Sequence, residues 1–210
     1  MHLADRISHA SRTRKLDLLL ETFGPTAETR VVDVGVTDAG WGDDPRCATT
    51  NFFEERYPWP ERITAVGQGA GEAFRARYPH IPYVHGDGCE LPFADGAFDL
   101  YVSNAVVEHV GAEAAQRRFV HEAVRVAGSV FLTTPNRWFP LEVHTRLPLV
   151  HWLPPAAAGR AYDLAGKGWA REVRPLGPAA LRRLFPPRTD VRIVNLGLTL
   201  VALAGDRVRR

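Results

Sequence analysis

The chain has 210 residues, of which 45% are hydrophobic and 24% are charged, enough to bury one sizeable core. We therefore expect one α/β domain and no second domain. Nucleic-acid binding requires a concentrated basic face, and the formal net charge of +2 is too small to indicate one. We therefore expect no nucleic-acid partner.

The first half of the chain alternates helix and strand patterns. Apolar residues at helical spacing predict an amphipathic helix over 14–23. Short, mostly apolar runs then predict three strands of a parallel sheet, with a helix ahead of the third. The strands are expected at 30–35, 63–67 and 83–85, and the helix at 72–78.

The second half continues the alternation. A mostly apolar run from Phe98 to Ala105 predicts a fourth strand, buried on both faces. A helix at 112–126, a strand at 129–134, a helix at 178–185 and a hairpin of strands at 190–195 and 198–203 complete the expected order.

Residues 86–110 read GDGCELPFADGAFDLYVSNAVVEHV. This segment resembles the middle of class I S-adenosylmethionine (SAM) dependent methyltransferases with a type 11-like methyltransferase domain. The resemblance implies an α/β fold with a doubly wound Rossmann-like sheet of seven mostly parallel strands and a C-terminal antiparallel hairpin. It also implies SAM as the cofactor, S-adenosylhomocysteine (SAH) as its product, and an Asp that reads the adenine amine, which here is Asp87.

Two positions depart from the family pattern. Members of the family carry D-x-G-x-G-x-G after the first strand, whereas Thr37 stands at a later glycine position here. Members also end the second strand in an acid that binds the ribose, whereas this chain has Gly67 and Gln68. If no other residue bonds the ribose, Gly67→Asp should tighten SAM binding. The expected cofactor contacts are Asp33, Gly35, Thr37, Gly67, Gln68, Asp87, Gly88 and Asn104.

A longer segment at 43–50 follows the altered glycine loop and delays the next helix to about 51–55. Thr50 or Asn51 is expected to cap that helix, and its capped start is expected to help cradle the cofactor.

A Pro- and Trp-rich section at about 135–175 follows the fifth strand, on the edge where open α/β sheets bind ligands. We interpret it as an insertion that forms a lid and acceptor pocket. Prolines break its first part, at 134–154, into pieces too short to form a core alone. A packing segment that covers one sheet edge is the alternative. The expected substrate contacts are Asn136, Arg137, Trp138, Glu142 and Trp152.

Methyl transfer from a sulfonium needs a nucleophile held in line and, for a hydroxyl or amine acceptor, a base near neutral pKa. His144 in the lid and His109 in the Glu-His-Val segment are the catalytic candidates, with a structural role as the alternative for each. We expect no metal site, because no Asp/His cluster has convincing metal-ligand spacing, although His144 and His151 stay open as ligands.

The leading hypothesis is a methyltransferase that acts on a small molecule such as a sugar, a lipid-linked acceptor or a secondary metabolite. The alternatives are a methyltransferase fold repurposed for a non-methylating reaction, or for a non-catalytic binding role. A Rossmann dehydrogenase is disfavoured, because no G-x-G-x-x-G opens the helix after the first strand.

Cysteine usage and apolar runs predict the cellular setting. Cys47 and Cys89 are far apart, which argues against a disulfide framework. The N-terminus lacks the apolar stretch of an export signal, and the longest apolar run, near 196–204, is too short for a membrane span. We expect a cytoplasmic monomer or homodimer.

Overall fold

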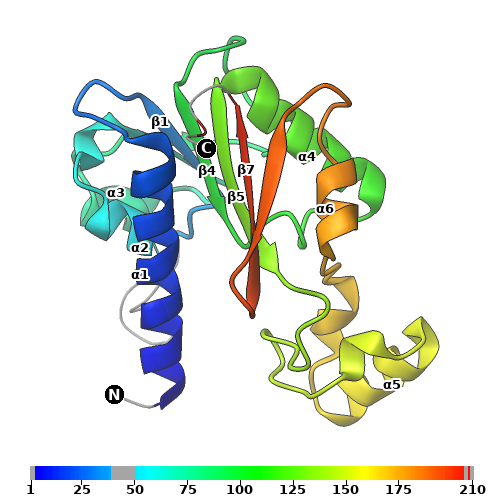
Figure 1. The fold of residues 1–210 in the computed structure, drawn as a ribbon. Coiled ribbons are helices and arrows are strands. Elements are labelled where there is room, and N and C mark those ends of the chain that lie inside the picture. Colours follow the sequence, from blue (N-terminus) through cyan, green and yellow to red (C-terminus); the bar gives the residue numbers. More distant parts are fainter. Residues whose placement is uncertain (1–2, 39–50, 206–207, 209–210) are drawn as a thin grey trace.

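The computed structural model describes residues 3–38, 51–205 and 208, with side chains from residue 10 onward. Its strands form a seven-stranded sheet in the order β3-β2-β1-β4-β5-β7-β6 (Figure 1). The strands are β1 (Val31–Val34), β2 (Ile63–Gly67), β3 (Tyr83–His85), β4 (Leu100–Asn104), β5 (Ser129–Pro135), β6 (Val191–Asn195) and β7 (Thr199–Gly205).

The first five strands pair in parallel, and β7 runs antiparallel to both β5 and β6. At the turn between β6 and β7, the Asn195 side chain accepts the backbone N–H of Gly197 at 2.8 Å, and Gly197 has a positive φ of 85° that a glycine tolerates. The predicted fold class, a mostly parallel sheet that ends in an antiparallel hairpin, is confirmed.

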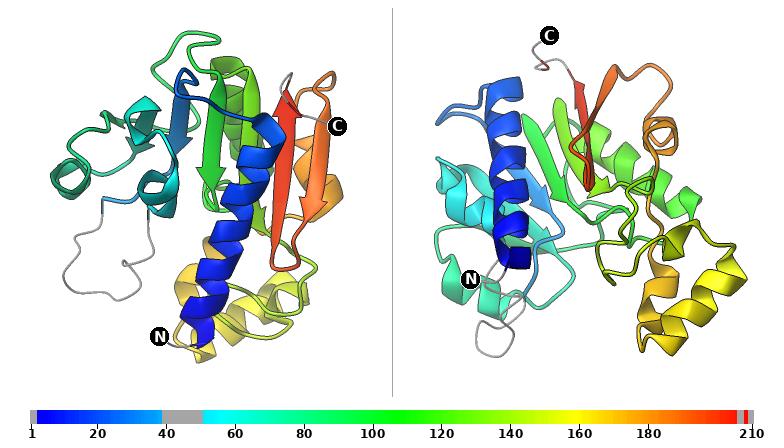
Figure 2. Two further views of the ribbon diagram at one scale, coloured as in Figure 1. Left: turned by 60° about the vertical axis from the view of Figure 1, so that its left-hand side comes forward. Right: turned by 60° about the horizontal axis from the view of Figure 1, so that its bottom comes forward.

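Helices cover both faces of the sheet (Figure 2). On one face, α1 (Leu3–Phe23) and α3 (Glu72–Arg77) pack Leu19, Phe23 and Phe74 onto the sheet. On the other face, α4 (Glu113–Val126) and α6 (Pro178–Arg183) pack Phe119 and Leu181. The two hydrophobic cores follow from strands that are apolar on both sides.

The helix predicted at 14–23 is much longer, because α1 begins at Leu3. Its first half has few regularly spaced apolar residues, so hydrophobic periodicity could not identify it. This half of α1 extends beyond the carboxyl edge of the parallel strands, at the bottom of Figure 1. It therefore lies beside the edge where ligands are expected.

The segment after β5 lies at the same edge (Figures 1 and 2). It contains η3 (Val150–Trp152), α5 (Pro155–Leu164) and η4 (Gly168–Glu172). Within 134–154, where prolines predict pieces too short to form a core alone, η3 is buried together with the later elements α5 and η4 in a small shared cluster. The cluster consists of Val150, Ala158, Tyr162 and Ala170.

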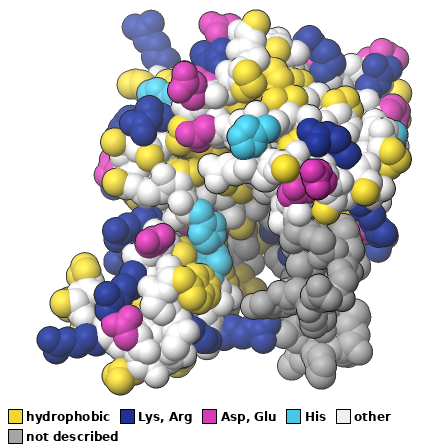
Figure 3. Space-filling view, turned by 180° about the vertical axis from the view of Figure 1, so that it is seen from behind, with side chains coloured by type: hydrophobic (Ala, Val, Ile, Leu, Met, Phe, Trp, Pro, Cys, Tyr) yellow, Lys and Arg dark blue, Asp and Glu magenta, His cyan; other side chains and the backbone are white. Residues whose placement is uncertain are grey.

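Two short elements, α2 (Phe52–Arg56) and η2 (Pro60–Arg62), connect the described part of the β1–β2 region. Among the described residues, no helix is both long enough and apolar enough to cross a membrane. In the space-filling view from behind, acidic and basic side chains are mixed over the described surface (Figure 3).

Candidate functional site

Two cavities lie at the carboxyl ends of the parallel strands. The first, of about 330 Å³, is lined by residues of α1, α2 and the ends of β1 and β4. The second, of about 460 Å³, is lined by residues that follow β1, β2 and β3 and by residues of α4. They share Gly35, Val36, Ala105 and His109, so the two cavities adjoin along a common wall.

That common wall requires two unusual backbone conformations. Gly35 has φ of 104°, and a Cβ built on it would lie 2.1 Å from a methyl group of Val106, so only glycine fits. Ala105 has φ of 59°, a strained conformation for a residue with a side chain. It turns the chain sharply after β4, and the Glu108-His109 pair follows directly.

The second cavity collects Gly67, Gln68, Asp87 and Gly88 from the predicted cofactor set. Asp87 accepts the backbone N–H of Cys89 through Oδ1 at 2.8 Å, which fixes the loop after β3. Gly88 lies against Phe119, so its missing side chain serves close packing onto α4.

The structure argues against the expectation that Gly67→Asp would tighten SAM binding. A Cβ on Gly67 would lie 2.6 Å from Tyr83 Oη and 2.8 Å from the Val36 carbonyl oxygen. Because the backbone atom cannot move away as a flexible side chain could, an aspartate at this position is expected to distort the site instead of tightening SAM binding.

The first cavity contains two buried carboxyl groups, Asp33 at β1 and Glu54 on α2. The two carboxyl groups interact with one another through a side-chain hydrogen bond and through charge. Burial, reinforced by the charge of Glu54, raises the pKa of Asp33 well above its usual range, and burial raises the pKa of Glu54 to about 7. Groups perturbed in this way often mark functional sites.

Asn51 does not cap α2 through its side chain as predicted. Its amide instead bonds the main chain of Thr37 twice, accepting the N–H at 3.0 Å and donating to the carbonyl at 2.9 Å. Both residues line the first cavity, so this pair of bonds shapes the loop after β1. The other predicted cap, Thr50, and the segment 43–50 lie outside the described residues.

Asn104 also lines the first cavity, where it meets α1. Its Oδ1 accepts hydrogen bonds from Lys15 Nζ at 2.5 Å and from Thr133 Oγ1 at 2.9 Å. Burial and the charge of Arg12 lower the pKa of Lys15 to about 8. The sequence missed Lys15 and Arg12 as site residues, and their only signal was basic charge on a helix beside the ligand edge.

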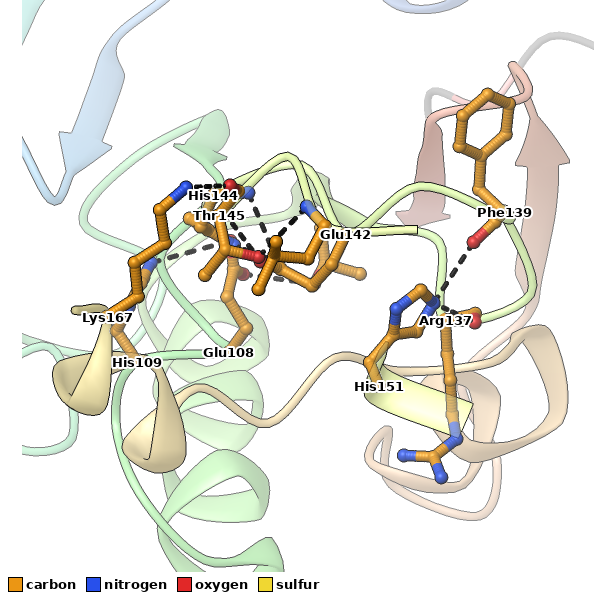
Figure 4. A network of polar contacts seen from close by, with 11 residues as sticks. Glu108, His109, Arg137, Phe139, Glu142, His144, Thr145, His151 and Lys167 are labelled. Carbon is orange, nitrogen blue, oxygen red and sulfur yellow. Dashed lines mark hydrogen bonds and ion pairs between the residues drawn. The ribbon is translucent and has the colours of Figure 1, made fainter. Parts of the chain in front are cut away.

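The two predicted catalytic histidines come together around Glu108 in the first cavity region (Figure 4). His144 Nε2 and His109 Nε2 lie 3.8 Å and 3.9 Å from the same atom, Glu108 Oε1. The two imidazole rings meet edge to face, with centroids 4.9 Å apart. Glu108 Oε2 accepts a hydrogen bond from Thr134 at 3.0 Å, whereas Oε1 is buried without a partner among the described residues.

Glu142 lies behind His144, away from Glu108. Its Oε1 pairs with His144 Nδ1 at 2.8 Å, and its Oε2 accepts the Thr145 N–H at 2.7 Å and the Thr145 hydroxyl at 2.5 Å. Lys167 donates to the Thr145 carbonyl, which ties this turn to η4. Glu142 therefore fixes the orientation of the His144 ring.

The pKa shifts in this cluster follow from burial and charge. Burial raises the pKa of Glu108 to about 7. Burial alone would raise the pKa of Glu142, but the bonds from His144 and Thr145 outweigh it and lower that pKa to about 2. Burial opposes protonation of His144, yet Glu142 outweighs it and raises the pKa, while burial and the His144 charge lower the pKa of His109.

The other predicted substrate residues do not line either cavity. Asn136 is buried and donates to the Gly197 carbonyl at 2.9 Å, which ties the start of the lid to the β6–β7 turn. Trp138 is 62% exposed, and Trp152 Nε1 donates to the Arg137 carbonyl at 2.6 Å. Their contact with an acceptor therefore stays a prediction.

His151 lies apart from the other two histidines (Figure 4). Its Nε2 faces the carbonyl oxygens of Arg137 and Phe139, at 2.8 Å and 3.0 Å. A ring nitrogen that donates to backbone carbonyls holds the lid together and is not available to a ligand.

Comparison with known proteins points to one family. Residues 50–129 match the family model of the methyltransferase domain. A probable SAM-dependent methyltransferase of Mycolicibacterium smegmatis is 46% identical over 66 residues, which is 30% of this chain and 24% of that protein. The chain thus matches about a quarter of that relative's length.

Solved structures share the fold over most of the chain. Geranyl diphosphate C-methyltransferase from Streptomyces coelicolor, solved with SAH, has a TM-score of 0.60 and 15% identity, over 95% of this chain and 82% of that one. N-methyltransferase NodS from Bradyrhizobium japonicum, also solved with SAH, has a TM-score of 0.57 and 17% identity. The match covers 95% of this chain and 87% of that one.

Proposed function

We propose that this chain is a class I methyltransferase that transfers a methyl group from SAM to a small-molecule acceptor, because residues 50–129 match the methyltransferase domain and the fold is shared with solved methyltransferases. The observation that carries the proposal is the pair of adjoining cavities at the carboxyl edge of the sheet. One cavity suits the nucleoside end of the cofactor, and the other suits the acceptor.

The cofactor's adenosine occupies the second cavity, with the adenine amine on Asp87. Its methionine portion passes Gly35 toward the first cavity, where Asp33 and Glu54 stand. Two buried carboxyl groups favour a positively charged ligand, and the cofactor carries an ammonium and a sulfonium. We therefore expect the transferable methyl group at the common wall.

The acceptor occupies the first cavity, beside His109 and His144. Transfer to a hydroxyl, amine or carbon nucleophile depends chiefly on holding that atom in line with the methyl group and the sulfur. We assign contact with the reacting atom to these two histidines. The segment 135–175 acts as the lid, and a sugar, a lipid-linked molecule or a secondary metabolite is the expected acceptor class.

Calorimetry with SAM and with SAH tests the proposal. Submillimolar binding of either ligand is the expected result. The alternative functions, a non-methylating reaction or a non-catalytic binding role, gain support from the absence of a ribose-binding acid at Gly67. No binding heat up to millimolar SAM and SAH would favour those alternatives. A cytoplasmic location and a monomeric or homodimeric state stay predictions from the sequence.

A further inference from the structure

We propose that Glu108, His109 and His144 bind a divalent transition-metal ion such as Zn²⁺ at the wall of the acceptor cavity. One ligand atom of each residue lies within 4.8 Å of the other two. Two imidazole nitrogens and one carboxylate are a ligand set used by catalytic zinc sites and by non-haem iron sites.

The two distances to Glu108 require only a small contraction, and all three ligand atoms already lie within 4.8 Å of one another. Zinc binds nitrogen and oxygen at about 2.0 to 2.2 Å, which separates tetrahedral neighbours by roughly 3.4 Å. The two nitrogens already lie 3.8 Å and 3.9 Å from Glu108 Oε1. Shifts of about half an ångström would close both gaps, within the range of side-chain rotation.

An independent observation is the unpartnered oxygen of Glu108. Thr134 holds Oε2 at 3.0 Å, and Oε1 is buried and faces the two histidines with no hydrogen-bond partner among the described residues. A buried polar atom without a partner is costly, and a bound cation would remove that cost.

Glu142 supplies the outer support that metal-binding histidines usually have. When His144 Nδ1 carries the proton that bonds to Glu142 Oε1 at 2.8 Å, its Nε2 presents a lone pair toward Glu108 (Figure 4). Thr145 in turn fixes Glu142 through two hydrogen bonds. The carboxylates of Glu108 and Glu142 also offset the charge of the ion.

The open side of the metal faces the acceptor. His109 is half exposed and lines both cavities, so remaining coordination positions would point into the cavity space. We therefore infer an acceptor that carries a metal-coordinating oxygen, such as a hydroxyl. The ion would lower the pKa of that hydroxyl, whose proton leaves to water.

In the transfer step, the acceptor oxygen forms a bond to the methyl carbon while the sulfur–carbon bond breaks and its electron pair returns to sulfur, giving SAH. This catalytic role rests on the proposed function, whereas binding of the ion does not. The single lone pair of His144 Nε2 cannot bind the ion and take up the proton of the acceptor hydroxyl at the same time. The metal role therefore replaces the base role predicted from the sequence.

Zinc binding is measured on the full chain, with any affinity tag removed and bound metal stripped with EDTA. Equilibrium dialysis against buffered Zn²⁺, followed by elemental analysis, should give one ion per chain. Glu108→Gln and His144→Ala should each weaken binding by about a hundredfold or more, and Glu142→Gln by roughly 10- to 100-fold.

Matched controls are His80→Gln and His121→Gln, which change exposed histidines outside both cavities and should leave zinc binding unchanged. Zinc should also raise the unfolding temperature of the wild-type chain, whereas Mg²⁺ at the same concentration should not, because it prefers oxygen ligands. Circular dichroism verifies that each variant is folded.

The proposal is overturned if Glu108→Gln and His144→Ala, both folded, bind zinc as the wild type does, or if Mg²⁺ binds equally well. Calorimetry of the stripped protein with SAH separates the two proposals. If the protein binds SAH but not zinc, the metal proposal fails and the proposed methyltransferase function stands. If it binds zinc but not SAH, the proposed methyltransferase function fails and the metal site stands.

Discussion

Asp87 combines two roles at the residue scale, because it lines the second cavity and also holds its own loop through the Cys89 N–H at 2.8 Å. Asp87→Ala removes both contacts and should weaken SAH binding by about 1 to 3 kcal/mol, roughly tenfold to a hundredfold. Calorimetry measures the change.

Two further variants separate the two roles of Asp87. Asp87→Asn keeps an oxygen for the Cys89 N–H but loses the charge, so it should preserve the loop and still bind SAH more weakly. Asp95→Ala breaks a surface ion pair with Arg125 outside both cavities and should bind SAH normally. An unchanged dissociation constant in Asp87→Ala would place the adenine elsewhere.

Glu54 gives a pH-dependent prediction. Its folded pKa of about 7 exceeds the usual value of 4.5, so between these pH values the folded chain holds a proton that the unfolded chain releases. Stability from this group is therefore lost as pH rises from about 4.5 to 7. Glu54→Gln removes the buried charge and should be more stable than the wild type at pH 8, by up to about 2 to 3 kcal/mol.

Thermal unfolding at pH 8 and at pH 4.5 tests this expectation. The advantage of Glu54→Gln should shrink to a few tenths of a kcal/mol at about pH 4.5, where the wild-type carboxyl is protonated in the folded chain and about half protonated in the unfolded chain. Glu28→Gln, a change on an exposed side chain, serves as the control and should show no such dependence. An equal effect of Glu54→Gln at both pH values would contradict a raised pKa.

At the scale of elements, the segment after β5 behaves as a small unit with its own apolar cluster under α5 and η4. Lys167 of this unit donates to the Thr145 carbonyl in the turn that carries His144. The unit can therefore position His144 without belonging to either core that covers the sheet.

Tyr162→Ala should loosen this unit while the sheet stays folded. Removing a buried aromatic side chain typically costs about 3 to 5 kcal/mol, which is enough to open a small element locally. Hydrogen exchange should show lost amide protection over 150–172 and unchanged protection in β4 and β5. Leu164→Ala, at a side chain that is 91% exposed, is the control. Uniform loss of protection across the chain would show that the unit is part of the main core.

At the scale of the whole molecule, the ligand edge brings together α1, the β1 and β4 ends, α2 and the lid turn. A ligand that bridges these elements binds only the folded chain. SAH at a hundred times its dissociation constant should therefore stabilise the fold by about 2.7 kcal/mol.

For a chain of this size, that stabilisation corresponds to roughly 5 to 10 °C in unfolding temperature. Scanning calorimetry with and without SAH measures it. Adenine alone, at the same concentration, should give a smaller shift because it cannot reach the first cavity. No shift with saturating SAH would mean that the two cavities do not bind it as one ligand.

The sequence by itself determined the order of strands and helices, because each buried strand and amphipathic helix has a local apolar pattern. The resemblance over 86–110 supplied the sheet topology and pointed to Asp87 and His109. The position after the fifth strand also led to the predictions of His144 as a catalytic residue and of Glu142 as a substrate contact, both of which stay predictions.

Only the tertiary structure decided which of these groups meet. Glu108 and His144 lie far apart in the chain, as do Asp33 and Glu54. The two members of each pair come close only when β1, β4 and β5 align in the sheet. The small core of the lid and the steric conflict at Gly67 likewise depend on packing between distant segments. Local patterns carry no information on such contacts, because burial and electrostatic coupling arise from three-dimensional proximity.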